Sequence, residues 1–216
     1  MDNGTLIVAA LAILLVGGYA VGAILNARLM AALTAGLREA LSWPGGRPRV
    51  QRPGRSIVRV ESPAPVRGAG PVVATARMAP REAIPLWIMW ALQGRGDVLD
   101  VRAHLDAPPS GAGLVADTRH RTGRAAIRAA VAAGGTRRDV PGTALATVAY
   151  DAAGHAAMER MAPVAAGVAN LVLVELRAVQ PRLTFLVSLR GMPRSLSSLR
   201  QDLQRLVGAA RGRSRA

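Results

Sequence analysis

The feature that most constrains this chain is its apolar N-terminal segment, Thr5–Leu25. It runs for 21 residues without a charged side chain, between Asp2 and Arg28. The hydrocarbon core of a bilayer is about 30 Å thick, and about 20 apolar helical residues cross it. Leu, Ile and Val dominate the segment, and each favours insertion by about 0.3–0.6 kcal/mol. The sequence therefore predicts one transmembrane helix near the N-terminus.

The charges around this segment predict its orientation. No basic residue precedes it, which is untypical of a cleaved secretory signal. Arginines follow it instead, beginning with Arg28, Arg38 and Arg47. Because short basic segments stay on the cytosolic side, we expect the N-terminus outside and the C-terminal domain in the cytosol.

The helix is expected to continue past the membrane to about residue 42. Leucines recur at every fourth position up to the Pro44-Gly45-Gly46 stop. This amphipathic extension would either lie along the lipid head groups or hold the domain away from them. The row consists of Leu25, Leu29, Leu33, Leu37 and Leu41.

Gly18 and Gly22 form a GxxxG pair within the predicted span. Small residues at this spacing let a second helix approach closely. Glycine is also common in membrane helices without such a role. The pair predicts a possible contact face for a partner helix in the membrane.

The composition narrows the function classes. Cysteine is absent, which excludes disulfides, thiolate nucleophiles and cysteine metal sites. Lysine is absent too, which excludes a P-loop lysine and a Schiff-base lysine. The net charge of +15 indicates an anionic partner such as lipid head groups, nucleic acid or an acidic protein.

The rest of the chain predicts an α+β (mixed α/β) domain behind a short linker. Residues 43–54 are rich in Pro, Gly and Arg and read as a solvated spacer or a head-group patch. Residues 55–194 mix strand and helix patterns without strict alternation. The expected strands are 56–61, 72–78, 98–105, 113–116 and 143–150, with a hairpin of 168–176 and 183–189; the expected helices are 122–133 and 152–162.

A helix expected over 80–92 is apolar on every face, although Pro85 could kink it or mark its true start. Such a helix is either buried in the core or in contact with lipid or a hydrophobic client protein. The residues predicted for the second role are Leu86, Trp87, Met89 and Trp90.

The C-terminal segment, 195–216, is predicted as an amphipathic helix with a basic tail. Its leucines fall on one helix face, and arginines follow to the end. Arginine can neutralise phosphates without reading sequence. We expect contact with RNA or anionic lipid, unless the tail is simply solvated, through Arg205, Arg211, Arg213 and Arg215.

No catalytic or metal-binding motif stands out. The three histidines are scattered, and no dinucleotide fingerprint or nucleophile elbow is present. We therefore expect a non-enzymatic protein without cofactor or metal. The alternative is a membrane-tethered hydrolase or nuclease whose distant carboxylates converge, and its candidates are Asp97, Asp106, Asp117 and Asp151. A lipid-binding scaffold is a third possibility.

Five short stretches carry a family resemblance: Asn26–Leu29, Leu37–Glu39, Ala76–Glu82 (ARMAPRE), Asp97–Asp106 (DVLDVRAHLD) and Pro181–Leu189 (PRLTFLVSL). Their order resembles the calumin family, the coiled-coil-domain subunit of the PAT (protein associated with translocon) complex, as a short relative of prokaryotic or archaeal type. The long charged coiled coil of that family is reduced here to Arg205–Ala216.

The resemblance implies a non-enzymatic factor in membrane-protein biogenesis. Family members place an α/β domain in the cytosol, pair with a small membrane subunit called Asterix, and lie beside the Sec translocon under the ribosome. The implied role is an intramembrane chaperone or scaffold for nascent multipass membrane proteins. The implied partners are lipid, an Asterix-like subunit, the translocon and ribosomal RNA.

Overall fold

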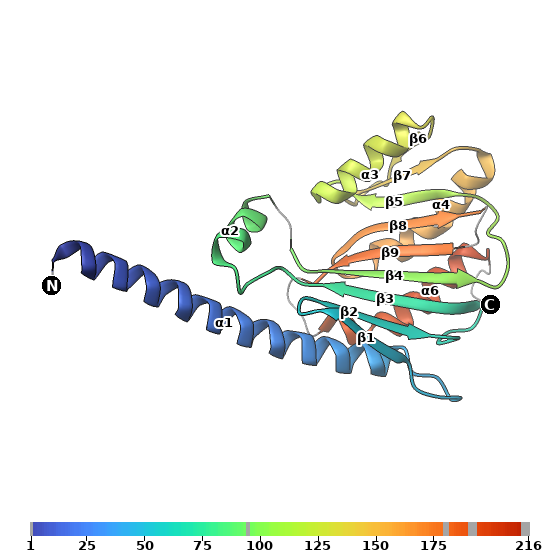
Figure 1. Cartoon of the computed structure of the whole chain (residues 1–216). Coiled ribbons are helices and arrows are strands. Elements are labelled where there is room, and N and C mark those ends of the chain that lie inside the picture. Colours follow the sequence, from blue (N-terminus) through green and yellow to red (C-terminus); the bar gives the residue numbers. More distant parts are fainter. Residues whose placement is uncertain (1, 94–95, 179–181, 190–193, 213–216) are drawn as a thin grey trace.

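The computed structural model of the chain describes residues 2–93, 96–178, 182–189 and 194–212 (Figure 1). Its first element is one unbroken helix, α1 (Asn3–Ala40). α1 is long and apolar enough to cross a membrane, and only 6% of its most apolar 18-residue stretch is buried. Its N-terminal half projects from a domain against which its C-terminal half packs (Figure 1). The predicted continuation of the helix beyond Leu25 is confirmed.

Nine strands of the described chain form a single sheet in the order β1-β2-β3-β4-β9-β8-β5-β7-β6. Every neighbouring pair is antiparallel, and the predicted hairpin is β8 with β9. The strands are β1 (Arg49–Gly54), β2 (Ile57–Ser62), β3 (Ala69–Arg77), β4 (Val98–Leu105), β5 (Gly113–Asp117), β6 (Thr136–Asp139), β7 (Leu145–Ala149), β8 (Leu171–Arg177) and β9 (Arg182–Ser188).

The remaining helices cover the sheet unequally. One face packs against the second half of α1 and against α4, α5 and α6, in one continuous core. α3 covers the opposite face at β5 and β7 and closes a smaller core. The helices are α2 (Ile84–Leu92), α3 (Arg121–Ala132), α4 (Ala152–Ala166), α5 (Arg194–Ser197) and α6 (Leu199–Ala210). This arrangement confirms the predicted α+β class.

The leucine row of α1 turns toward the sheet as it leaves the apolar segment. Leu25 is 46% exposed, whereas Leu33, Leu37 and Leu41 are at most 2% exposed in the main core. Each such burial stabilises the fold by about 1.5–3 kcal/mol. The second half of the leucine row is therefore buried in the domain core; it neither lies along the lipid head groups nor holds the domain away from them. It makes α1 a rigid part of the domain.

The linker predicted for residues 43–54 is wrong over its second half. Residues 49–54 form β1, which pairs with β2 at the edge of the sheet. Pro53 is compatible with an edge strand, where not every N–H needs a partner. β6 at the other edge was missed as well, because all four of its residues are exposed and leave no apolar alternation.

The C-terminal segment is also part of the domain. The leucine face predicted for 195–209 is confirmed, since Leu196, Leu199, Leu203 and Leu206 are all buried in the main core. α5 and α6 divide this segment at Ser198. The division into a domain of 55–194 and a separate 195–216 segment is therefore wrong for the described part of the tail.

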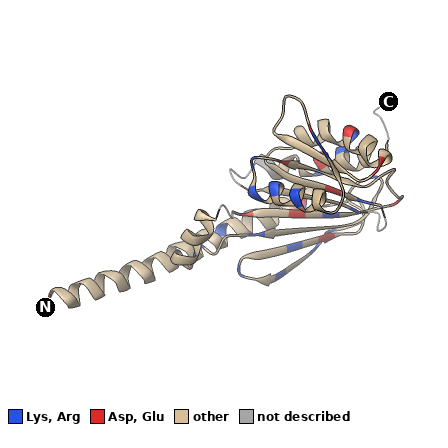
Figure 2. Ribbon diagram, turned by 90° about the horizontal axis from the view of Figure 1, so that it is seen from above, with Lys and Arg blue, Asp and Glu red and all other residues tan. Residues whose placement is uncertain are grey.

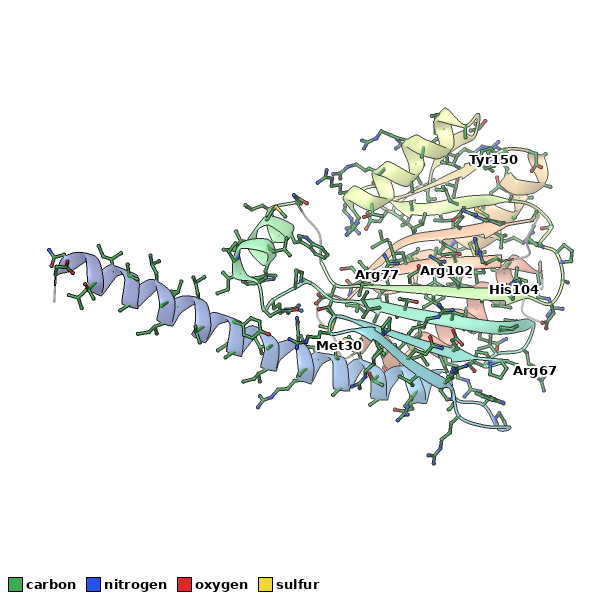
Figure 3. All side chains as sticks on the ribbon, viewed as in Figure 1. Met30, Arg67, Arg77, Arg102, His104 and Tyr150 are labelled. Carbon is green, nitrogen blue, oxygen red and sulfur yellow. The ribbon has the colours of Figure 1, made fainter. Side chains whose placement is uncertain are left out.

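The two ends of the sheet have different surroundings. At one end, here called the α2 end, β3 leads into α2 and β4 returns from it (Figure 1). Met30 and Arg77 lie toward this end, and Arg67 and Tyr150 lie at the opposite end (Figure 3). α1 reaches from one to the other, because Asn26 bonds to Ala79 and the Leu41 carbonyl accepts from Ser62. The strand axes thus lie roughly along the axis of α1, with alternate strands running in opposite directions.

Candidate membrane-facing site

α2 is not a core helix. None of its nine residues is buried, although all are apolar. Leu86, Trp87 and Met89 are 38–44% exposed, and Leu92 is 84% exposed. Trp90 is only partly exposed. The interpretation of this segment as a core helix is therefore wrong, and contact with lipid or a client protein stays as its prediction.

The N-terminus of α2 is set by Pro85. Pro80–Ala83 forms a turn in which the Ala83 N–H donates to the Pro80 carbonyl at 3.1 Å. The helix begins at Ile84, which places Pro85 in the first turn, where its missing N–H costs nothing. Of the two alternatives predicted for Pro85, the structure shows that it marks the start of the helix and does not kink it.

The glycine pair of α1 lies against the same chain. A Cβ added to Gly22 would lie 2.2 Å from the Arg81 carbonyl oxygen, and one added to Gly18 would meet the Ile84 side chain. Gly17, on another side of the helix, has nothing within 4 Å. The close approach that the pair predicted therefore occurs with the start of α2. A membrane partner at this face would have to displace it.

Four polar side chains, which we call the polar joint, connect α1 to the turn before α2 and to the start of β4. They are Asn26, Arg81, Glu82 and Asp97. Arg81 Nη1 donates to Asn26 Oδ1 at 2.9 Å and also forms an ion pair with Asp97. Asn26 Nδ2 donates to Glu82 and to the Ala79 carbonyl.

Asp97 holds the joint to the sheet. Its Oδ1 accepts from the Ala79 N–H at 2.7 Å, while its Oδ2 faces Arg81. The Arg81 and Asp97 side chains are only 21% and 14% exposed. Desolvated charge pairs of this kind are costly to break, because the remaining charge is left without compensation. The joint therefore fixes the angle between α1, α2 and the sheet.

The relation of α2 to α1 suggests how both would meet a bilayer. With Thr5–Leu25 across the membrane, Gly18 and Gly22 lie in the last turns of the span on the domain side. The start of α2 contacts α1 at this level, and α2 lies beside α1 near the end of the sheet (Figure 1), so it would lie near the membrane boundary. Tryptophan is favoured where hydrocarbon meets head groups. The projecting part of α1 shows almost no charged residues (Figure 2).

A basic side chain from the β1–β2 turn reaches the same level. Arg55 Nη1 donates to the Tyr19 hydroxyl of α1 at 2.9 Å. Its long apolar stem can lie along the helix while the guanidinium stays near the polar boundary. Exposed apolar residues of α1 and α2 and this arginine thus share one end of the molecule.

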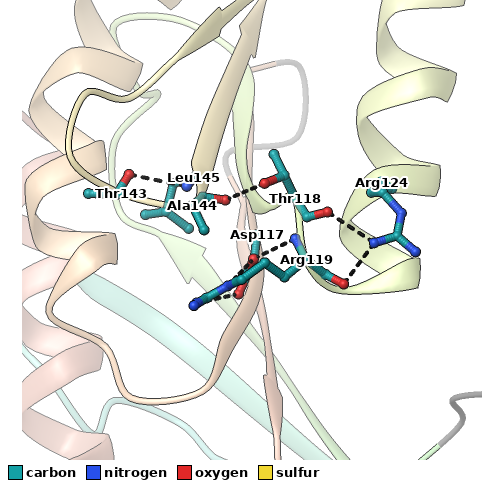
Figure 4. Close-up of polar contacts among 7 residues, drawn as sticks. All are labelled: Asp117, Thr118, Arg119, Arg124, Thr143, Ala144 and Leu145. Carbon is teal, nitrogen blue, oxygen red and sulfur yellow. Dashed lines mark hydrogen bonds and ion pairs between the residues drawn. The ribbon is translucent and has the colours of Figure 1, made fainter.

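The turn from β5 into α3 lies at the α2 end as well (Figure 1), and Figure 4 shows its polar contacts. Asp117 accepts from the Arg119 N–H at 2.8 Å and from its guanidinium at 3.1–3.2 Å. Thr118 bonds to the Ala144 carbonyl through both its N–H and its hydroxyl. Beside this turn is a cavity of about 690 Å³, lined in part by Asp117, Arg119 and His120.

The ionisation of Asp117 is governed by this turn. Partial burial acts to raise the pKa of Asp117, but the hydrogen bonds from Arg119 and the charges of Arg119 and His120 outweigh it, so the pKa is lowered. The same pairing raises the pKa of Arg119. The charged form of Asp117 is therefore the one that stabilises the turn.

Replacing Asp117 with asparagine is expected to lower the stability at pH 7 by up to about 1 kcal/mol, because Arg119 is largely exposed. A lowered pKa contributes stability above the unfolded value, and this stability is lost as the pH falls through the folded value. The gap between Asp117→Asn and the wild type should thus begin to shrink below about pH 3.9, the unfolded value, and close as the pH falls through the lower folded pKa. Thermal unfolding in detergent at pH 7 and pH 3 measures it, with the exposed Asp139→Asn as control. An unchanged gap would contradict the assignment.

The predicted C-terminal arginines lie away from this end. Arg211 packs against Gly68 in the turn between β2 and β3. That turn precedes the nine-residue β3, about 30 Å long, whose other end leads to α2. Arg213 and Arg215 lie outside the described residues. Arg211 is therefore not placed to contact the lipid that α1 and α2 would meet.

Arg205 lies on a different surface, the groove between α4 and α6. This groove has a volume of about 1170 Å³, and no acidic residue lines it in the described chain. Arg160 and Arg200 line it together with Arg205. Arg205 lies 4.0 Å from Asp202, which is nearly buried. An anionic partner of this groove would approach the helical face of the domain.

The four carboxylates of the hydrolase alternative do not converge. Asp97 and Asp117 lie at the α2 end, at the start of β4 and the end of β5. Asp106 and Asp151 follow the opposite ends of β4 and β7, and Asp151 caps α4 by accepting from the Gly154 N–H at 2.6 Å. Within the described ranges, no group of three or more His, Cys, Asp or Glu residues could hold a metal. The proposed four-carboxylate cluster is wrong.

No family model matches this chain, and no curated protein is significantly similar to it.

Proposed function

We propose that this protein is a single-pass membrane scaffold that contacts transmembrane helices of other membrane proteins. It would act without catalysis, as a biogenesis factor or chaperone for multipass proteins. α1 would anchor it, and α2 would lie in the membrane at the domain side. The cytosolic domain would be held upright by the polar joint.

The observation that carries this proposal is the exposure of α2. A nine-residue helix without a polar side chain is normally buried in a protein core, yet none of the residues of α2 is buried. Together with the projecting half of α1 it forms an apolar surface far larger than isolated surface leucines require. Because the start of α2 packs against α1 at Gly18 and Gly22, the exposed apolar sides of the two helices would offer one joint surface to a third helix.

The charge distribution supports the orientation. Arg28 and Arg38 follow the apolar part of α1, and Arg55 and Arg81 lie beside its last turns. Basic residues next to a span favour the cytosolic side. We therefore place the N-terminus outside and the sheet domain in the cytosol.

The partners implied by the calumin resemblance belong to this proposal. An Asterix-like subunit and the Sec translocon would meet the exposed apolar sides of α1 and α2 within the membrane. Ribosomal RNA would meet the domain at Arg205 and Arg211, because Arg205 lines the groove on the helical face and Arg211 lies at the β2–β3 turn, at the other end of the sheet from α2. The groove of α4 and α6 supports such an anionic partner, because three arginines and no acidic residue line it in the described chain.

Site-specific photocrosslinking tests the proposal. A photoreactive amino acid at Leu92, which is 84% exposed, is expected to capture transmembrane segments of newly made membrane proteins. The same group at Val131, 43% exposed near the far end of α3, should not capture them. Adducts with lipid alone at Leu92 would contradict the client role and favour the lipid-binding scaffold.

A further inference from the structure

We propose that Arg121 and Arg124, at the start of α3, bind the phosphates of anionic phospholipids in the leaflet that holds α2. The inference rests on the proposed placement of α1 and α2 in the bilayer. It adds a specific lipid class and a binding surface that neither the span nor α2 requires.

The position of α3 follows from one contact with α2. Arg121 Nη1 donates to the Gln93 carbonyl, the C-cap of α2, at 3.1 Å. Where α2 lies at the hydrocarbon boundary, the first turn of α3 is therefore at the level of the head groups. The α3 axis then runs away from α2 toward the far end of the sheet (Figure 1).

The charge of this surface is one-sided. Residues 119–128 contain four arginines and no acidic residue. Asp117 is the neighbouring carboxylate, and it pairs with Arg119. Arg121, Arg124 and Arg128 are exposed and recur along one side of α3, which is the helix nearest the viewer in Figure 2. An anionic surface on that side would meet no repulsion from the helix.

The guanidinium of Arg124 is held in place before any ligand arrives. Its Nη1 donates to the carbonyls of Thr118 and Arg119 at 3.1 and 2.8 Å (Figure 4). In the part of the chain that the structure describes, its Nε and Nη2 have no acceptor. These two nitrogens form the pair of parallel donors that suits a phosphate. Little side-chain entropy would be lost on binding, because the group is already fixed.

Membrane lipid is the occupant that the position favours. Attraction to an anionic leaflet fades within a Debye length of about 8 Å, so only arginines at the surface benefit. Arg121 and Arg124 are in the first turn next to α2, whereas Arg128 is one further turn away. A phosphate in the head-group layer is thus within reach of the first two and beyond the strongest attraction of the third.

Hydrogen exchange of the full-length protein in nanodiscs tests the proposal. Discs of phosphatidylcholine alone are compared with discs that also contain phosphatidylglycerol. Amides of 117–124 are expected to exchange at least about fivefold more slowly with the anionic lipid, which is the effect of only one of the two arginines at the surface. The variant Arg121→Gln/Arg124→Gln should lose this difference, and the matched Arg128→Gln should retain most of it. High salt should reduce it in the wild type.

Each of the other outcomes refutes a specific part of the proposal. Equal exchange in both discs, with Trp87 and Trp90 still quenched by brominated lipids, refutes the head-group site and leaves the membrane placement intact. Unquenched tryptophans refute the placement itself. Protection by RNA fragments that exceeds protection by phosphatidylglycerol would assign the surface to nucleic acid and refute the lipid site. A difference that persists in Arg121→Gln/Arg124→Gln would show a general effect of the leaflet charge.

Discussion

Replacing Gly22 with leucine is expected to separate α2 from α1. The new side chain would begin 2.2 Å from the Arg81 carbonyl oxygen and 2.8 Å from the Glu82 nitrogen. Backbone atoms cannot rotate away as a side chain can, so the turn before α2 has to move. Overpacking of this kind costs about 1–3 kcal/mol and more where the neighbour is rigid. We expect the upper end of this range, with the polar joint disrupted as well.

The chain offers a matched control in Gly17→Leu. It adds the same side chain to the same helix, and nothing lies within 4 Å of its Cβ position. Helix propensity and membrane insertion are thus equal in the two variants. Gly18→Ala should be intermediate, because its neighbour is the flexible end of Ile84.

Lipid quenching of tryptophan measures the separation. In a Trp43→Phe background only Trp87 and Trp90 emit, and brominated lipids should quench them strongly in the wild type and in Gly17→Leu. In Gly22→Leu the quenching depth is expected to change and the melting temperature to fall. If Gly17→Leu and Gly22→Leu behave alike, the contact between α1 and the α2 turn is not the one that positions α2.

Much of the fold could be predicted because its signals are local. A few neighbouring residues are enough to recognise the apolar segment of α1, the alternation in β4 and the leucine face of α6. β1 and β6 could not be found this way. Both are edge strands held by a neighbour, and their side chains are too exposed to show a period of two.

The site was predictable only in part, for a related reason. Leu86, Trp87 and Met89 could be named from composition, since an apolar helix has few possible surroundings. The polar joint was missed, because Asn26 and Arg81 are 55 positions apart and neither has a local motif. A usable signal was the polar Asn26 directly after the apolar segment, since an amide there requires a buried partner or water. Gly18 and Gly22 signalled a close approach but not that the chain itself supplies the neighbour.

This last point changes the meaning of the glycine pair. A small-residue face in a membrane helix is usually read as an oligomerisation surface. Here the small-residue face is occupied by the turn before α2 and by Ile84, so contacts within one chain fix the position of α2 relative to α1. A client helix would then contact the outer apolar sides of α1 and α2. The joint sets the shape of that surface from the cytosolic side.

Replacing Asp97 with alanine is expected to destabilise the protein by about 3 kcal/mol, because it leaves Arg81 charged and mostly buried. It also leaves the Ala79 N–H without its acceptor. Asp97→Asn keeps an oxygen for that N–H and removes only the charge, so it should cost less. The difference between the two variants separates the backbone bond from the ion pair.

Asp100→Ala is the matched control for this prediction. Asp100 lies in β4, three residues after Asp97, and is similarly buried at 16% exposure. It also pairs with an arginine, but that partner, Arg102, is 51% exposed. A pair with one solvated partner contributes about 0–1 kcal/mol. Removing Arg81 as well, in Asp97→Ala/Arg81→Leu, should restore part of the loss, since no uncompensated charge remains. Unfolding in detergent, followed by circular dichroism, measures all four variants. Equal losses for Asp97→Ala and Asp100→Ala would mean that the joint is solvated and does not hold α1 and α2 to the sheet.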